Sequence, residues 1–154
     1  MSPNYGYSIT GLDPEKTAKA SGRDIRCSPK ACREVCNFIK GKKLEDAKEY
    51  LFQVIELKKA IPFKRHNKHV AHRKGLDKWS AGKFPRKVAN EIMTVLEAAE
   101  ANAEYKGLDI DKTIIKHAAV SRGPIIKKNI PRAFSRSSPY YKLLTHIEIV
   151  LEEK

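Results

Sequence analysis

The sequence lacks several features that define common classes of protein. It has no apolar run of about 18 residues, as a membrane-spanning helix requires, and no secretory signal pattern. Its three cysteines are an odd number, so we expect no disulfide scaffold and a reducing, cytoplasmic environment. No glycine-rich phosphate loop follows a predicted strand. These absences argue against a membrane protein, a secreted disulfide-rich domain and a phosphate-loop enzyme.

Acidic residues are scarce relative to basic ones. The chain of 154 residues has 31 Lys and Arg against 18 Asp and Glu, a formal net charge of +13. This charge, on a chain of a length that suits one domain, predicts a polyanionic partner. A membrane surface is the competing partner, but the basic residues lie in predicted loops and strands rather than on one face of an amphipathic helix. We therefore expect a nucleic acid as partner and no membrane.

One stretch, Lys112–Ile147, contains no acidic residue. Its two ends, Thr113–Ser121 and Lys142–Leu151, are rich in β-branched and apolar residues and predict strands. We predict one very long β-hairpin in which the prolines prevent regular pairing of the far half. A disordered basic loop between two core strands is the alternative. The basic residues of the stretch are Lys112, Lys116, Arg122, Lys127, Lys128, Arg132, Arg136 and Lys142.

Three helices are predicted before the hairpin. The first, Pro29–Lys40, begins after Ser28 as N-cap and ends at Gly41. The second is Leu44–Ala60 and the third is Pro85–Lys106. Apolar residues recur at helical spacing in each: Cys32, Val35, Cys36 and Ile39; then Leu44, Ala47, Leu51, Val54 and Ile55; then Val88, Ile92, Val95, Leu96, Ala99 and Ala103.

The segment before the first helix is less regular. A short strand is predicted at Gly22–Cys27. Residues 1–21 are interpreted as a surface arm, with a turn or single helical turn after Asp13 and an optional edge strand through Tyr5, Tyr7 and Ile9. The order of elements predicts an α+β domain of three helices packed on a small, mostly antiparallel sheet. We divide it into a globular body (about 1–111 and 143–154), a basic loop (61–84) and an extended hairpin (112–147).

A second basic zone, residues 58–88, holds a single acidic residue, Asp77, and interleaves aromatic side chains with positive charge. Long loops in compact domains are usually functional or disordered. Three histidines in it, His66, His69 and His72, have a spacing that resembles metal ligands, but the neighbouring Lys and Arg residues would repel a cation. The basic residues are Lys58, Lys59, Lys64, Arg65, Lys68, Arg73, Lys74, Lys78, Lys83, Arg86 and Lys87.

No group of residues in the sequence predicts catalysis or a cofactor. Glu45, Glu49, Glu56, Glu91, Glu97 and Glu100 are interpreted as solvated charge on the second and third helices. Cys32 and Cys36 fall on an apolar stripe with Cys27 nearby, which favours packing over metal ligation. We therefore predict no enzyme, no metal and no cofactor, and instead RNA contact through phosphate and 2′-OH groups. Stacking on Trp79, Phe134, Tyr140 and Tyr141 would add to it.

Several motifs then resemble one known family. Arg26-x-Ser28-Pro29-Lys30-x2-Arg33-x-Val35-x3-Ile39-x-Gly41-Lys42 is similar to the opening helix signature of the universal large-subunit ribosomal protein family twenty-two. Ile115-Lys116-His117-Ala118-Ala119 and Pro131-Arg132-Ala133-x-Ser135-Arg136 resemble the arms of that family's hairpin, although glycine is frequent where Ser135 stands. Ile61-Pro62-Phe63-Lys64-x-His66-Asn67 and Phe84-Pro85-x-Lys87 resemble the long insertion of its archaeal and eukaryotic branch.

The resemblance implies a structural component of the large ribosomal subunit, located in the cytoplasm, that binds the large-subunit rRNA and assists subunit assembly. It implies neighbouring ribosomal proteins near the tunnel exit and the nascent polypeptide as further partners. The hairpin tip would line the nascent-peptide exit tunnel. The tip residues are Arg122, Gly123, Pro124, Ile125, Ile126, Lys127, Lys128, Asn129, Ile130, Pro131 and Arg132.

The candidate RNA contacts join the helix signature to the two basic zones. Two other functions stay open: a free-standing nucleic-acid-binding or chaperone protein, and a histidine-dependent nuclease. The predicted RNA-binding residues are Arg26, Lys30, Arg33, Lys42, Lys64, Arg65, His66, His69, Arg73, Lys74, Trp79, Lys83, Lys87, Lys116, His117, Arg122, Lys127, Lys128, Arg132, Arg136, Tyr140 and Lys142.

Overall fold

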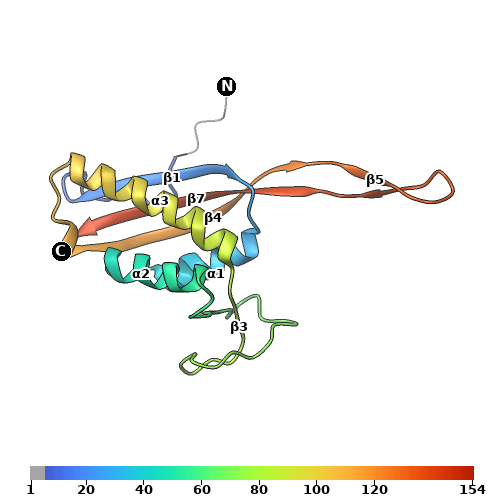
Figure 1. Cartoon of the computed structure of the whole chain (residues 1–154). Helices are drawn as coiled ribbons and strands as arrows, with labels where there is room; N and C mark the ends of the chain where they lie inside the picture. The colour runs from blue at the N-terminus through green and yellow to red at the C-terminus, as the bar shows by residue number, and fades with distance from the viewer. Residues whose placement is uncertain (1–5) are drawn as a thin grey trace.

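The computed structural model describes residues 6–154. A three-stranded antiparallel sheet has the order β1-β7-β4, with β1 at Thr17–Ile25, β4 at Thr113–Ile126 and β7 at Lys142–Glu153. Helices α1 (Pro29–Ile39), α2 (Leu44–Ile55) and α3 (Arg86–Tyr105) form a second layer against it (Figure 1). The predicted α+β class is confirmed.

The core lies between the helices and the central strand β7. Alternate residues of β7, Ile147, Ile149 and Leu151, are fully buried in the hydrophobic cluster that the helices complete. The apolar stripe of α1 is buried as predicted, and so is that of α3. Each fully buried aliphatic side chain contributes roughly 1.5–3 kcal/mol, so the fold rests on this layer contact.

Helix α2 is shorter than predicted: it ends at Ile55 rather than at Ala60. Leu57 has a left-handed backbone conformation, with φ of 66°. The backbone N–H of Lys58 donates to the carbonyl of Gln53 at 2.8 Å, a longer-range bond that closes the turn instead of continuing the helix. The apolar pattern does not show this end, because Leu57 is exposed and contributes nothing to the buried face.

The segment before α1 also differs from the prediction. Strand β1 begins at Thr17 rather than Gly22, and Ala18 and Ala20 are buried in the core instead of lying in a surface arm. Pairing with β7 overrides the helical preference of these alanines. Residues 14–16 form a turn, and no strand passes through Tyr7 and Ile9; Tyr5 lies outside the described residues.

The N-terminal arm packs on the sheet. The backbone N–H and the hydroxyl of Ser8 both donate to Oε2 of Glu148 at 2.9 Å. Glu148 belongs to β7 and is buried, although its strand neighbours Ile147 and Ile149 belong to the core that the helices cover. Because side chains alternate along a strand, the arm covers the face of the sheet opposite the helices.

Strands β4 and β7 extend beyond the body as a hairpin (Figure 1). Their pairing runs to Ile126 opposite Lys142. Two further strands, β5 (Asn129–Pro131) and β6 (Ser137–Pro139), continue it toward the tip. The prediction that prolines prevent regular pairing of the far half is confirmed in part, because the register of β4 and β7 shifts between Arg122 and Ile125, beside Pro124. It is wrong for β5 and β6, which pair although both end in proline, where a missing N–H costs least.

The basic loop leaves and re-enters the body through a short pair of strands. Strand β2 (Ile61–Pro62) pairs with β3 (Gly82–Lys83), and His72 forms a bridge with Ala81. The loop is thus anchored to the body at both of its ends.

The short 3₁₀ helix η1 (Ile110–Lys112) connects the end of α3 to β4.

Candidate nucleic-acid interface

Most residues of the predicted RNA-binding set carry their side chains on the surface. Within this set, Lys116 alone forms an ion pair in residues 6–154, with Glu152 at 2.8 Å. The other charged members are open to an external anion. Exposed are Arg26, Lys30, Arg33, Lys64, Arg65, His69, Arg73, Lys74, Lys83, Lys87, Lys116, Arg122, Lys127, Lys128, Arg132, Arg136 and Tyr140; half-buried are Lys42, His66, Trp79, His117 and Lys142.

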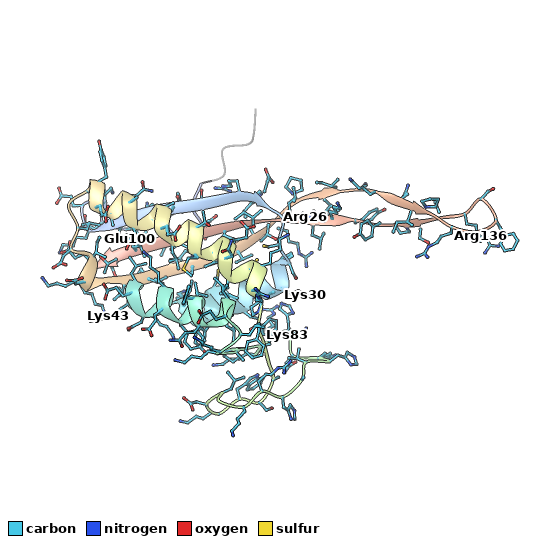
Figure 2. The ribbon with its side chains drawn as sticks, in the orientation of Figure 1. Arg26, Lys30, Lys43, Lys83, Glu100 and Arg136 are labelled. Carbon is cyan, nitrogen blue, oxygen red and sulfur yellow. The ribbon has the colours of Figure 1, made fainter. Side chains whose placement is uncertain are left out.

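The two basic zones lie on different parts of the molecule. Figure 2 shows Lys30 and Lys83 close together where α1 meets the basic loop, and Arg136 near the far end of the hairpin. Glu100, on α3, lies away from both and forms an ion pair with Lys48. Its side chain is half-buried, as is that of Glu91, so these two glutamates are less exposed than predicted.

A buried carboxylate fixes the start of the basic loop. Glu34, on α1, is 2% exposed. Its two oxygens accept the backbone N–H groups of Lys64, Arg65 and His66 at 3.0, 3.0 and 2.8 Å. Hydrogen bonds to a charged group are stronger than neutral ones. Glu34 thereby sets the direction of three consecutive residues whose side chains were predicted to contact RNA.

Trp79 fixes the same loop from its other arm. Its indole N–H donates to the carbonyl of Phe63 at 2.9 Å, and its ring is half-buried. Phe63 is itself buried in the core cluster. Trp79 therefore ties the loop to the body. Its half-buried ring is less accessible than a ring on which an RNA base would stack.

Several cations in and beside the loop sit against aromatic rings. The ammonium of Lys42 lies 3.8 Å from the ring centre of Phe38 and 4.9 Å from that of Tyr50. The guanidinium of Arg73 lies 5.3 Å from the ring centre of Phe84. Partial burial lowers the pKa of Lys42, and the charge of Lys59 lowers it further. These contacts pre-orient long side chains that would otherwise lose more entropy on binding.

Positive charges also converge where the hairpin leaves the body. The charges of Arg26 and Lys128 lower the pKa of Lys142. The three cations come from three segments: the connection between β1 and α1, the hairpin and the start of β7. Their mutual repulsion would be relieved by an anion such as a phosphate, so the hairpin root is suited to an RNA backbone.

The hairpin carries apolar side chains in the open. Phe134 is 92% exposed. Such a surface is unusual for a protein that acts alone in water and marks a site of interaction. Positive charge from Lys127, Lys128, Arg132 and Arg136 lies between these side chains. The other exposed apolar residues of the hairpin are Ile125, Ile126, Ile130, Tyr140, Tyr141 and Leu143.

The histidines and cysteines do not form a metal centre among the residues described. No group of three or more His, Cys, Asp or Glu side chains there is placed to hold a metal ion. Cys27, Cys32 and Cys36 are buried in the core, and burial raises the pKa of the Cys36 thiol to about 12. In the same part of the chain, no helix has the length and apolar character of a membrane span.

Comparison with known proteins gives one consistent result. The model of the family described as ribosomal protein L22p/L17e matches residues 20–152. The chain belongs to this family. Among its relatives named large ribosomal subunit protein uL22, that of Methanopyrus kandleri is 53% identical, over 98% of this chain and 97% of its own length. Those of Archaeoglobus fulgidus and Methanococcus aeolicus are 48% and 50% identical, over 97% and 92% of this chain and 95% and 92% of their own lengths.

In this L22p/L17e chain, sequence reasoning missed Glu34 and Glu148. The other polar side chains of α1, Lys30, Arg33 and Asn37, are exposed, so a glutamate on this helix gives no sign of burial. Glu148 alternates with the apolar Ile147 and Ile149, which is the pattern of a position that faces away from the core. A signal was nevertheless present for Glu34. It lies between Cys32 and Cys36, on the buried side of α1, where an ionisable group is expected only with polar partners.

Proposed function

We propose that this protein is a structural component of the large ribosomal subunit that binds the large-subunit rRNA and has no catalytic role. The observation that carries this function is the open cationic surface: in the two basic zones, every Lys and Arg except Lys58, Lys112 and Lys116 has no carboxylate partner within residues 6–154. The names of the relatives support the same assembly.

We further propose different tasks for the two parts of the molecule. The body and the basic loop hold rRNA through phosphate contacts. The hairpin reaches into the subunit, where its tip, Arg122–Arg132, lines the nascent-peptide exit tunnel. Its mixture of exposed apolar and cationic side chains suits a surface that meets both RNA and an extended peptide. Neighbouring ribosomal proteins near the tunnel exit and the nascent polypeptide are then its protein partners, and the cytoplasm its location.

The test is co-sedimentation of the tagged protein with large subunits through a cushion of high salt. A component buried among rRNA helices stays with the subunit, because many simultaneous phosphate contacts are not released together. A free-standing nucleic-acid-binding protein is lost from the pellet, because each phosphate contact adds roughly 0.7–0.9 to the slope of log K against log salt. Loss of the protein at high salt would overturn the proposal. A nuclease would cleave RNA and lose activity in His66→Ala, which we do not expect.

A further inference from the structure

A pocket of about 650 Å³ lies where α1, the basic loop and the start of α3 meet. Its wall includes Ser28, the N-cap of α1, and Lys30 from the first turn of that helix. Arg65 from the loop also lines it, as do Lys83 and Phe84, which precede α3. Figure 2 shows Lys30 and Lys83 on the same side of the body. No acidic residue lines the pocket in the described structure. Its volume is in the range of pockets that bind small molecules.

The shape of this pocket is fixed by buried contacts. Glu34 holds the backbone of Arg65 and His66, which form one wall. Trp79 holds the carbonyl of Phe63, which forms another. Because these anchors lie in or beside the core, the backbone of the pocket wall is held in place before a ligand binds. A preformed site loses less entropy when a ligand binds.

The wall has a cationic part and an apolar part. Lys30, Arg65 and Lys83 are exposed and have no carboxylate partner in residues 6–154. The first N–H groups of α1, near Ser28, add a partial positive charge. Beside them lie the ring of Phe84, with the Arg73 guanidinium 5.3 Å from its centre, and Pro85. A ligand that fits both parts has an anionic group joined to a flat, weakly polar one.

We propose that this pocket binds a single unpaired nucleotide of RNA. Its phosphate lies among Lys30, Arg65 and Lys83, and its base lies against Phe84 and Pro85. A base-paired helix does not fit, since its bases are stacked inside and only an extruded nucleotide can enter a pocket. This proposal rests on the proposed function, rRNA binding. Surface charge alone would bind RNA without specificity, and the pocket adds one specific contact.

The experiment uses the full chain and two probes: a single-stranded RNA of four nucleotides, and the same RNA with one abasic position. Trp79 is the only tryptophan, and it is bonded to the pocket residue Phe63, so its fluorescence reports binding there. We expect the abasic RNA with the best-placed gap to bind about tenfold more weakly, from the loss of base stacking. A blunt-ended RNA duplex of two complementary strands should not change the Trp79 signal at the same concentration.

Ser28 allows a test that protects the fold. Its side chain makes no capping hydrogen bond in α1. Both Asp and Asn are favoured at this position, so Ser28→Asp and Ser28→Asn should fold alike. Ser28→Asp places a negative charge beside the phosphate and should weaken binding of the four-nucleotide RNA about tenfold, whereas Ser28→Asn should stay within about twofold. Lys30→Ala and Lys83→Ala should weaken it similarly, and Lys43→Ala, at the other end of the helical layer (Figure 2), should not.

Two failures are distinguishable. If the pocket variants bind the short RNA as well as the wild type does, or the abasic RNA binds equally, the pocket is not a nucleotide site, while the subunit assignment stands on its own sedimentation test. If the protein leaves large subunits at high salt, the proposed function fails. Equal weakening of RNA binding by Lys43→Ala and Lys30→Ala would also overturn the proposed nucleotide site. It would show that the RNA responds only to the net charge of the protein.

Discussion

The carboxylate of Glu34, inside the helical layer, accepts the backbone N–H of His66 at 2.8 Å, between positions 32 residues apart in the chain. This bond joins helix α1 to the basic loop, whose residues form little regular secondary structure of their own. The loop backbone at Lys64 and Arg65 is held by the same carboxylate. The direction in which the loop presents its positive charge is therefore decided inside the body, not on the surface.

Replacing Glu34 with Gln should loosen this attachment. Gln offers one acceptor oxygen in place of two, and its amide N–H₂ would face backbone N–H donors. We expect the free energy of unfolding to fall by about 1–3 kcal/mol. Amide hydrogen exchange at Lys64, Arg65 and His66 should accelerate more than elsewhere. The same substitution at exposed Glu45 is the control, and an equal effect there would contradict the role of Glu34.

The hairpin tip should be removable without loss of the body. Since Ile126 and Lys142 are paired, an Asn-Gly turn can join them in place of residues 127–141. No core residue lies in the removed segment, so thermal unfolding should remain one cooperative transition at nearly the same temperature. Loss of that transition would show that the body needs the tip.

The same excision should change RNA binding in a measurable way. It removes four cations, Lys127, Lys128, Arg132 and Arg136. At roughly 0.7–0.9 per phosphate contact, the slope of log K against log salt for a large-subunit rRNA fragment should become shallower by up to about 3. Substituting the four residues with Gln in the full-length hairpin is the matched control and should give the same slope. An unchanged slope would mean that the tip does not touch phosphate.

Local patterns predicted the elements whose own residues decide their structure. Helices α1 and α3 have a buried stripe at regular spacing. Pro29 marks the start of α1, and Gly107 follows the end of α3. The candidate site was predictable for the same reason: an acid-free basic stretch is visible without a fold. What the sequence could not show were contacts between distant segments, since Ser8 meets Glu148 and Glu34 meets the loop only after the sheet and helices have packed.

The errors have the same origin. The alanines of residues 18–20 favour a helix by themselves, and pairing with β7 makes them a strand. Pro131 and Pro139 argue against regular pairing by themselves, and both are accommodated at the ends of short strands near the tip. In each case the partner strand, which a reading of local sequence does not include, decides the outcome.

Gly22 should be intolerant of any side chain. A Cβ there would lie 2.8 Å from Cγ2 of Val95 on α3 and would also overlap the Ile25 side chain. Overpacking of a core by one methyl group costs typically 1–3 kcal/mol, so Gly22→Ala should lower the free energy of unfolding by that amount in a urea titration. Gly6→Ala is the control, because nothing lies within 4 Å of its Cβ position. Equal stability of the two variants would show that α3 can move away from β1.

The stability of the protein should decrease in mild acid through His117. Burial lowers the pKa of this side chain below its ordinary value of 6.5, the charge of Lys40 lowers it further, and Glu148 acts in the opposite direction. Its Nε2 lies 3.0 Å from the hydroxyl of Ser8, in the contact that holds the N-terminal arm. The unfolded chain therefore binds a proton more readily than the folded one.

It follows that the contribution of His117 is present above pH 6.5 and is lost as the pH falls through the lower, folded-state pKa. The free energy of unfolding, measured in urea at pH 7 and pH 5, should fall more in the wild type than in His117→Gln, which keeps a polar group near Ser8. The other titrating groups are common to both proteins and cancel in the comparison. An identical decrease in the two proteins would show that His117 gains its proton as easily in the folded chain as in the unfolded one.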